Sequence, residues 1–319
     1  MKRNKLTVID LFFYPFLVPN FLFLKTLVKR QISPKDVSYN LFKNSLFIKR
    51  LNCTISKKNN FFLLQGLNDI YDLMELCNAE FKIDENDKVT VNIQGLNISI
   101  NFWEEINIMK EIFKDGVYNV ETNDKFVFVD IGMNVGMTSL FFSKNPNTIK
   151  TYSFEPFPKT YEFARKNIDQ NPSYAPKINS FNYGVGETKE EKSIDYFLDY
   201  KGSVGTDGIP DRVLDDSVKG KMTSERVVLE SAETVVTKIR GENPGLKLYA
   251  KIDCEGAEYG ILKQLSDKNL LKEFELIMME WHNEGPVELV EILKKNGFIS
   301  YSFWPNNNDI GMIYSFRSS

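Results

Sequence analysis

The sequence predicts an α/β protein whose C-terminal two thirds forms a Rossmann-like, mostly parallel sheet covered by helices on both faces. The stretch FVFVDIGMNVGMTSL, Phe126–Leu140, is typical of a strand, a glycine turn and the start of a helix. From there onward apolar runs alternate with helical stretches, as in a chain of βαβ units. The apolar runs, which we expect to be strands, are Phe126–Val129, Ile149–Phe154, Ile178–Asn182, Leu246–Ile252, Leu276–Trp281, Ile299–Phe303 and Ile310–Ser315. The helical stretches are Met137–Ser143, Pro158–Gln170, Ala232–Ile239, Tyr259–Leu265 and Pro286–Asn296.

The preceding part of the chain predicts a smaller extension. Leu67–Cys77 has helical spacing, and KVTVNIQGLNISINF alternates in period two around Gln94-Gly95, which indicates a hairpin. Trp103–Tyr118 predicts a helix that ends at Gly116. We therefore expect an N-terminal helical and hairpin extension over residues 1–100 and a second domain over residues 101–319.

Composition limits the function classes. The chain has 319 residues, 42% of them hydrophobic, which favours a packed globular protein. Its three cysteines show no metal-binding or CxxC spacing and it has a single histidine, so no metal ligands are assigned from motif spacing. The cysteines are expected to be reduced thiols in a cytoplasmic protein, buried as small hydrophobic side chains.

Charge is unevenly distributed. Residues 1–60 contain twelve Lys or Arg against two Asp, a local net charge of +10, so the remainder carries −13 of the total −3. The acidic remainder argues against nucleic acid as a partner. The basic segment also contains the apolar stretch Leu11–Leu24, which is too short to span a bilayer. Two interpretations stay open: peripheral contact of residues 1–60 with the inner face of a membrane, or packing on the protein's own body, which we favour.

The glycine turn predicts the cofactor. Gly132 can supply the positive φ of the turn, and Gly136 permits close approach at the start of the helix. Asn134 stands where a dinucleotide fingerprint needs glycine, and Asp130 would repel a pyrophosphate. A ligand with an amino-acid end and no phosphate suits these residues better, and S-adenosylmethionine is such a ligand.

The next two strand ends offer further ligand contacts. Glu155 lies at the end of the second strand, where an acidic side chain can accept hydrogen bonds from two ribose hydroxyls. Asn182 ends the third strand, where its amide could meet the edge of an adenine. The long polar segment Asp195–Val228 is predicted to be a loop or lid near the site, with surface decoration as the alternative.

The fourth and fifth strands end in titratable groups. Asp253, Glu255 and Glu258 lie within six residues, and such clustered carboxylates are typical of functional sites. Glu280 and His282 share one face of the fifth strand. His282 is the one side chain whose ordinary pKa lies near neutrality.

The ordered set VDIGMNVG, FEPFP, NYGVG, KIDCEGAE and MEWH resembles the FkbM-type methyltransferase family over roughly Phe126–Phe316. The resemblance implies a Rossmann-like, seven-stranded class I methyltransferase sheet whose last strand is antiparallel. It also implies S-adenosylmethionine as cofactor and methylation of hydroxyl oxygens on sugars and natural products. The positions carried over as cofactor-binding are Asp130, Gly132, Asn134, Gly136, Glu155, Asn182 and Asp253. Asp253 and Glu255 are also expected to line the acceptor pocket.

The mechanism and its rivals stay open at this stage. A hydroxyl acceptor needs a base, and we expect His282 to serve, with Asp253 or Glu255 orienting it or acting instead. A competing arrangement places Mg²⁺ between Asp253, Glu255 and the acceptor hydroxyls. An NAD-linked oxidoreductase and a non-catalytic cofactor-binding or scaffold protein are the rival functions. The sequence does not identify the acceptor, and a surface polysaccharide or glycolipid sugar, hence glycan modification, is preferred.

Overall fold

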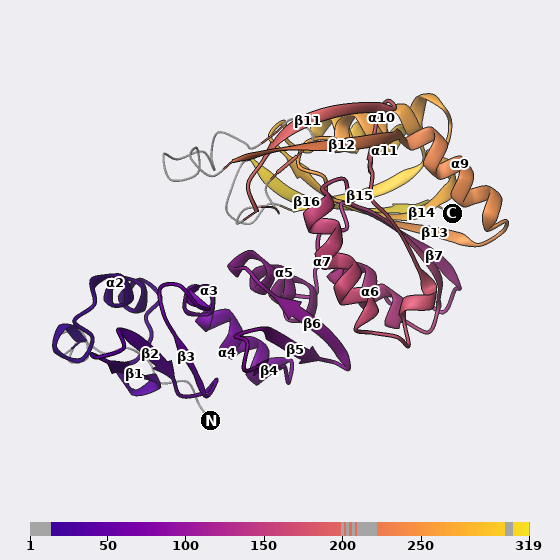
Figure 1. Ribbon diagram of the computed structural model, residues 1–319. Helices are drawn as coiled ribbons and strands as arrows, with labels where there is room; N and C mark the ends of the chain where they lie inside the picture. Colours follow the sequence, from indigo (N-terminus) through magenta and orange to yellow (C-terminus); the bar gives the residue numbers. More distant parts are fainter. Residues whose placement is uncertain are drawn as a thin grey trace. The chain divides into compact units, whose positions relative to one another are not determined.

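The computed structural model describes residues 14–198, 201, 204–205, 208, 222–303 and 309–318. The chain divides into two compact units, Met1–Val117 and Tyr118–Ser319 (Figure 1). The division falls after the helix α5 (Trp103–Phe113). The boundary predicted from the sequence, at residue 100, lies before this helix. The reason is local packing, because the chain at the end of α5 binds α4 (Leu67–Leu76) through Lys114 and Asp72, whose Nζ and Oδ2 atoms lie 2.7 Å apart.

The N-terminal unit contains two antiparallel three-stranded sheets and short helices. The hairpin predicted around Gln94-Gly95 is confirmed, with β5 and β6 on either side of it. Strands β1 to β4 were not predicted, since they are only three or four residues long. The strands are β1 Val37–Asn40, β2 Ser45–Ile48, β3 Cys53–Ile55, β4 Glu80–Ile83, β5 Val89–Ile93 and β6 Leu96–Ile100. The other helices are α2 Phe21–Lys29 and α3 Phe61–Gln65.

One side of the apolar N-terminal stretch packs inside its own unit. Tyr14, Val18 and Phe23 are buried, and the Tyr14 hydroxyl donates to the carbonyl of Ile32 at 2.7 Å. Over the described residues, no helix combines the length and the apolar composition that crossing a bilayer requires. Residues 11–13 of this stretch lie outside the described part of the chain.

The second unit is built on a seven-stranded sheet, as predicted. Its order is β15-β16-β14-β13-β7-β8-β9, and β16, the last strand, is antiparallel to both of its neighbours. The other neighbouring strands are parallel. The strands are β7 Phe126–Ile131, β8 Thr148–Phe154, β9 Ile178–Phe181, β13 Lys247–Ile252, β14 Phe274–His282, β15 Phe298–Phe303 and β16 Ile310–Arg317.

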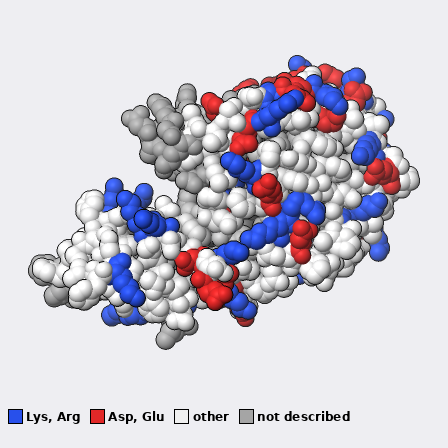
Figure 2. All heavy atoms as spheres, viewed as in Figure 1, with Lys and Arg blue, Asp and Glu red and all other residues white. Residues whose placement is uncertain are grey.

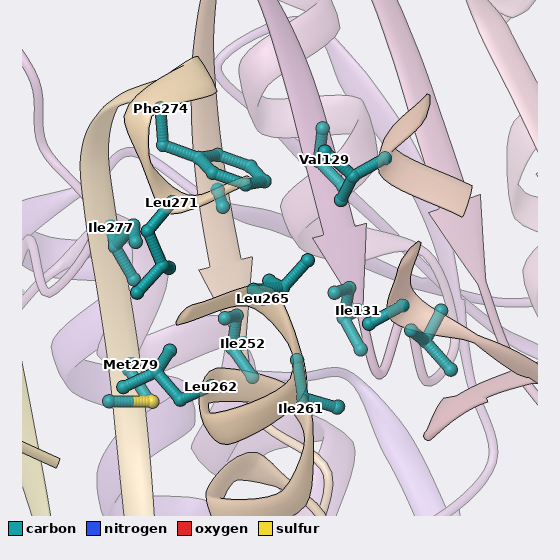
Figure 3. Packing of buried hydrophobic residues seen from close by; sticks show 14 of the residues in the cluster. Val129, Ile131, Ile252, Ile261, Leu262, Leu265, Leu271, Phe274, Ile277 and Met279 are labelled. Atoms are coloured by element: carbon teal, nitrogen blue, oxygen red, sulfur yellow. The ribbon is translucent and has the colours of Figure 1, made fainter. Parts of the chain in front are cut away.

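Helices cover both faces of this sheet (Figure 1). On one side lie α6 (Met137–Lys144) and α7 (Pro158–Asp169), and on the other α9 (Ala232–Glu242), α10 (Glu258–Asp267) and α11 (Val287–Lys295). The period-two alternation of β7 serves both faces. Phe128 stacks on Phe142 of α6 with ring centroids 3.7 Å apart, whereas Val129 and Ile131 belong to the core with α10 (Figure 3). The sheet is therefore packed against helices on both faces.

A second sheet of this unit lies between β9 and α9 in the chain. It contains β10 (Gly184–Gly186), β11 (Glu190–Tyr196) and β12 (Thr223–Ser231), with β11 and β12 antiparallel. Both flanks of the segment predicted as a loop, Asp195–Val228, are thus in strands. Apolar side chains at alternate positions, such as Ile194 and Tyr196, explain this. The middle of the segment lies mostly outside the described residues.

Candidate functional site

A cleft of about 550 Å³ opens beyond the carboxyl ends of β7, β8 and β13. In parallel α/β sheets this edge is where ligands bind. The lining residues are Ile131, Gly132, Asn134, Glu155, Pro156, Phe157, Gly184, Val185, Lys201, Val204, Gly205, Asp253, Cys254 and Glu255. Five sequence-predicted site residues are among them, and Lys201, Val204 and Gly205 come from the segment predicted to be a lid.

The loop after β7 fits tightly against the loop after β13. Gly132 and Gly136 both have φ +80°, which favours glycine. A Cβ on Gly132 would lie only 1.7 Å from the carbonyl oxygen of Asp253, so no side chain fits there. Gly136 packs on Ala164 of α7, as its predicted role at the start of the helix requires. The two glycines bring the loop against its neighbours instead of leaving room around it.

Asn134 and Glu155 also line the cleft, and a hydrogen bond joins them. Asn134 has φ +51°, and its backbone N–H donates to Glu155 Oε2 at 2.9 Å. Glu155 Oε1 accepts from the N–H of Phe157 at 3.1 Å. Burial raises the pKa of Glu155 to about 8, although both N–H donors lower it. Asn134 Oδ1 is buried and has no hydrogen-bond partner among the described residues, so it is an acceptor available to a ligand.

Asn182 does not line the cleft. Its side-chain amide donates to the carbonyls of Glu155 and Pro156, at 3.0 and 3.3 Å. The amide therefore holds the turn that follows β8. Its predicted place beside an adenine stays a prediction.

Asp130 lies behind the cleft and is fully buried. Ser139 Oγ donates to its Oδ2 at 2.5 Å, and Lys251 Nζ lies 3.5 Å from its Oδ1. Burial raises the pKa of Asp130, while Lys251 lowers it. The carboxylate thus already has a cationic partner inside the protein and does not face a ligand directly.

Lys251 is a further residue of the site, and no role is predicted for it in the sequence analysis. Its Nζ lies 3.2 Å from Asp253 Oδ2 and also donates to the carbonyl of Gly132. Burial alone would lower the pKa of Lys251, but Asp253 and Asp130 raise it above the usual value. The signal was present, because Lys251 and Asp253 lie two residues apart at the end of one strand. This one ammonium group ties the glycine loop, Asp130 and Asp253 together.

His282 ends β14 and is held from behind by Glu258. Its Nδ1 lies 3.0 Å from Glu258 Oε1, which also accepts from the His282 backbone N–H at 2.7 Å. On the other side of the ring, Nε2 lies 3.6 Å from Glu255 Oε1 and 4.0 Å from Glu280 Oε1. Burial lowers the pKa of His282, but Glu258 and Glu255 outweigh it and raise the pKa to about 9. In this state the imidazole carries a proton at neutral pH, which opposes the role of base predicted for it.

The structure thus brings the predicted residues together in two layers. Gly132, Asn134, Glu155, Asp253 and Glu255 line the cleft. The other predicted residues, Asp130, Gly136, Asn182 and His282, do not line the cleft, and the hydrogen bonds of Asn182 and His282 are made to neighbouring parts of the same unit. Glu258, which the sequence showed only as one carboxylate of a cluster, is fully buried and fixes His282.

The strand order, with one antiparallel seventh strand, and the cleft beyond the glycine loop define a class I methyltransferase fold. Comparison with known families agrees with this class. The chain belongs to the FkbM methyltransferase domain family, whose profile matches residues 130–300.

Several characterised proteins are similar to the chain. The AMB antimetabolite synthetase AmbE of Pseudomonas aeruginosa is 24% identical over 246 residues, covering 65% of this chain and 11% of that protein. Methyltransferase sdnD of Sordaria araneosa is 24% identical over 213 residues, covering 60% and 81%. A solved FkbM methyltransferase of Methylobacillus flagellatus has a TM-score of 0.41 at 10% identity, covering 62% of this chain and 45% of that one. The chain thus spans about a tenth of AmbE and under half of the solved protein.

Proposed function

We propose that the protein is an S-adenosylmethionine-dependent O-methyltransferase. The observation that carries this proposal is one cleft with Glu155 on one wall and Asp253 and Glu255 on another, in a chain of the FkbM family. The first carboxylate suits the hydroxyls of a nucleoside, and the other two suit an acceptor that must lose a proton. The NAD-linked alternative has no support from the family.

The residues present fit this cofactor. Glu155 is held by two backbone N–H donors, which leaves lone pairs on both of its oxygens for ribose hydroxyls. Asn134 Oδ1 is an unused acceptor suited to an ammonium group. Asp130, predicted to bind that group, instead acts through Lys251 and the carbonyl of Gly132. The cofactor end of the cleft is therefore formed by Asn134 and Glu155.

The other end suits proton removal from an acceptor. S-adenosylmethionine supplies a methyl group bonded to a positively charged sulfur. As the new C–O bond forms and the C–S bond breaks, the hydroxyl proton must leave, and Asp253 and Glu255 are the carboxylates at the cleft that can receive it. Much of the rate enhancement would come from holding the acceptor oxygen in line with the C–S bond.

Calorimetric titration tests the cofactor directly. We expect S-adenosylhomocysteine and S-adenosylmethionine to bind at one site per chain and NAD⁺ not to bind. Glu155→Ala should weaken S-adenosylhomocysteine binding by about 10-fold or more, since the hydrogen bonds between Glu155 and the ribose hydroxyls are lost. Binding of NAD⁺ alone would favour the oxidoreductase, and absence of all binding would favour the scaffold.

For the acceptor, we infer a hydroxyl of a glycan or of a related small molecule. This proposal rests on the basic segment over residues 1–60, which could bring the enzyme to a membrane where glycolipid sugars are assembled. Mass spectrometry of glycans from cells with and without the gene would show loss of one methyl group from a defined sugar. Unchanged glycans in the deletion strain would refute this acceptor class.

Exposed apolar side chains support the membrane part of that inference. Phe16, Phe21 and Phe42 are exposed, Phe42 completely. Asn20 Nδ2 donates to Asn44 Oδ1 at 2.8 Å, so the chain before α2 and the turn that carries Phe42 lie side by side. Lys and Arg side chains are spread over the visible face of the same unit (Figure 2). Aromatic and basic side chains together are typical of peripheral membrane segments.

Cosedimentation with lipid vesicles tests this contact. We expect the protein to bind vesicles that contain phosphatidylglycerol, and Phe42→Ser together with Phe16→Ser to reduce the bound fraction. Equal, weak sedimentation with anionic and neutral vesicles would overturn the membrane inference and leave the methyltransferase proposal untouched.

A further inference from the structure

We propose that Asp253, Glu255 and His282 form a binding site for one divalent transition-metal ion at the acceptor end of the cleft. The role we assign to the ion, binding the acceptor hydroxyl, rests on the proposed function. Metal binding itself does not, since it can be measured without cofactor or acceptor.

The three side chains converge closely enough to share an ion. One possible ligand atom from each lies within 4.8 Å of the other two. The separation of 3.6 Å between His282 Nε2 and Glu255 Oε1 is too long for a good hydrogen bond. In a tetrahedral site with metal–ligand bonds of roughly 2.0–2.2 Å, neighbouring ligand atoms lie about 3.3–3.6 Å apart. His282 and Glu255 thus already have the spacing of ligands, and only Asp253 must approach.

Glu258 prepares His282 for this role. Its Oε1 accepts the backbone N–H of His282 and also faces Nδ1, and its Oε2 accepts the N–H of Gly256 at 2.8 Å. Glu258 Oε1 can only accept hydrogen bonds, so it favours a donor at Nδ1. In a neutral imidazole the single ring proton is therefore on Nδ1. Nε2 then presents its lone pair toward Glu255. A buried carboxylate behind a histidine ligand is the usual second shell of a metal site, where it fixes the ring and its tautomer.

The backbone at Glu255 has an uncommon conformation. Glu255 has φ +54°, in the left-handed region that few non-glycine residues adopt. Such strain is concentrated at functional sites, where surrounding structure maintains it. Gly205 of the same chain packs directly against Glu255, because a Cβ on Gly205 would lie 2.3 Å from the Glu255 carbonyl oxygen.

Carboxylates surround this histidine. Asp253, Glu255, Glu258 and Glu280 all lie around His282. Negative charge on several sides attracts a cation to this position.

The ligand set selects the type of ion. Two carboxylates alone suit Mg²⁺, which was the arrangement considered from the sequence, but an imidazole nitrogen favours Zn²⁺, Mn²⁺ or Co²⁺. Three protein ligands leave open positions, which is the arrangement of catalytic rather than structural sites. An acceptor hydroxyl bound at such a position would lose its proton more easily.

The test uses full-length, untagged protein treated with EDTA and then dialysed. Calorimetric titration with ZnCl₂, with no cofactor present, should show one strong site per chain, and MgCl₂ should bind far more weakly. Because His282 is the single histidine, electron spin echo spectra of protein loaded with Mn²⁺ should show one directly bound imidazole nitrogen. Glu258→Gln should weaken Zn²⁺ binding about 10- to 100-fold, and His282→Gln at least as much.

Glu280→Gln is the matched control. It removes a negative charge at a similar distance from Nε2 but no proposed ligand, so Zn²⁺ affinity should change less than about 5-fold. Unchanged Zn²⁺ affinity in His282→Gln, or absence of the imidazole signal, would overturn the proposal and leave only general attraction of cations to acidic groups. Binding of S-adenosylhomocysteine to the metal-free protein separates failure of the metal site from failure of the proposed function.

Discussion

Alanine at Gly132 should destabilise the protein in two ways, through the left-handed backbone conformation and through a steric clash of the new Cβ. Both Gly132 and Gly245 have a left-handed φ, at +80° and +77°. A Cβ at Gly245 would meet nothing within 4 Å, whereas a Cβ at Gly132 would lie 1.7 Å from the Asp253 carbonyl oxygen. Gly245→Ala therefore pays only for the backbone conformation, about 1–2 kcal/mol. Gly132→Ala also pays for overpacking, about a further 1–3 kcal/mol.

Scanning calorimetry measures the difference. For a unit of this size, each kcal/mol corresponds to about 2–4 °C in melting temperature. Gly132→Ala should therefore melt roughly 2–12 °C below Gly245→Ala, by the same conversion. It should also weaken S-adenosylhomocysteine binding, because the loop must move away from Asp253, while Gly245→Ala should bind normally. Equal melting temperatures for the two variants would refute the tight contact between the loops after β7 and β13.

Two further predictions concern buried charges. The folded pKa of Glu155 is raised from 4.5 to about 8, so its contribution to the free energy of unfolding should fall as pH rises from 4.5 to 8. The ionised carboxylate of Glu155 accepts hydrogen bonds from ribose hydroxyls better than the protonated form. The calorimetric affinity for S-adenosylhomocysteine should therefore increase between pH 6 and 9, and Glu155→Gln should remove this pH dependence. The same pH dependence in the variant would show that another group causes it. Lys251→Met leaves Asp130 and Asp253 without their cationic partner. Urea unfolding should therefore show that the free energy of unfolding falls by about 3–5 kcal/mol. Adding Asp130→Asn should recover part of that loss, and additive losses in the double variant would contradict the ion pair.

The sheet was predictable because its strands carry strong, repeated signals. Runs such as Phe126–Val129 and Leu276–Trp281 are buried on both faces, so they consist almost wholly of apolar residues, and helical stretches separate most of them. The N-terminal strands β1 to β3 carry no such signal. They are three or four residues long and take their stability from pairing with each other.

The site was predictable to the extent that strand ends in a parallel sheet meet at one edge. Asp253, Glu255 and Glu155 could be placed there by this rule alone. The rule does not say which carboxylate faces the cleft and which is neutralised inside, and Asp130 was assigned to the ligand for that reason. Its partner, Lys251, becomes apparent only when β7 and β13 pair side by side.

The pairing of β11 with β12 has a consequence for how this enzyme could diversify. Tyr196 and Thr223 are paired at the ends of the two strands, so the segment between them starts and finishes at adjacent points. Lys201, Val204 and Gly205, which come between the two strands in the sequence, line the cleft together with Glu155 and Asp253. Substitution of these three residues would change the lining of the cleft and leave the glycine loop and the seven-stranded sheet unchanged.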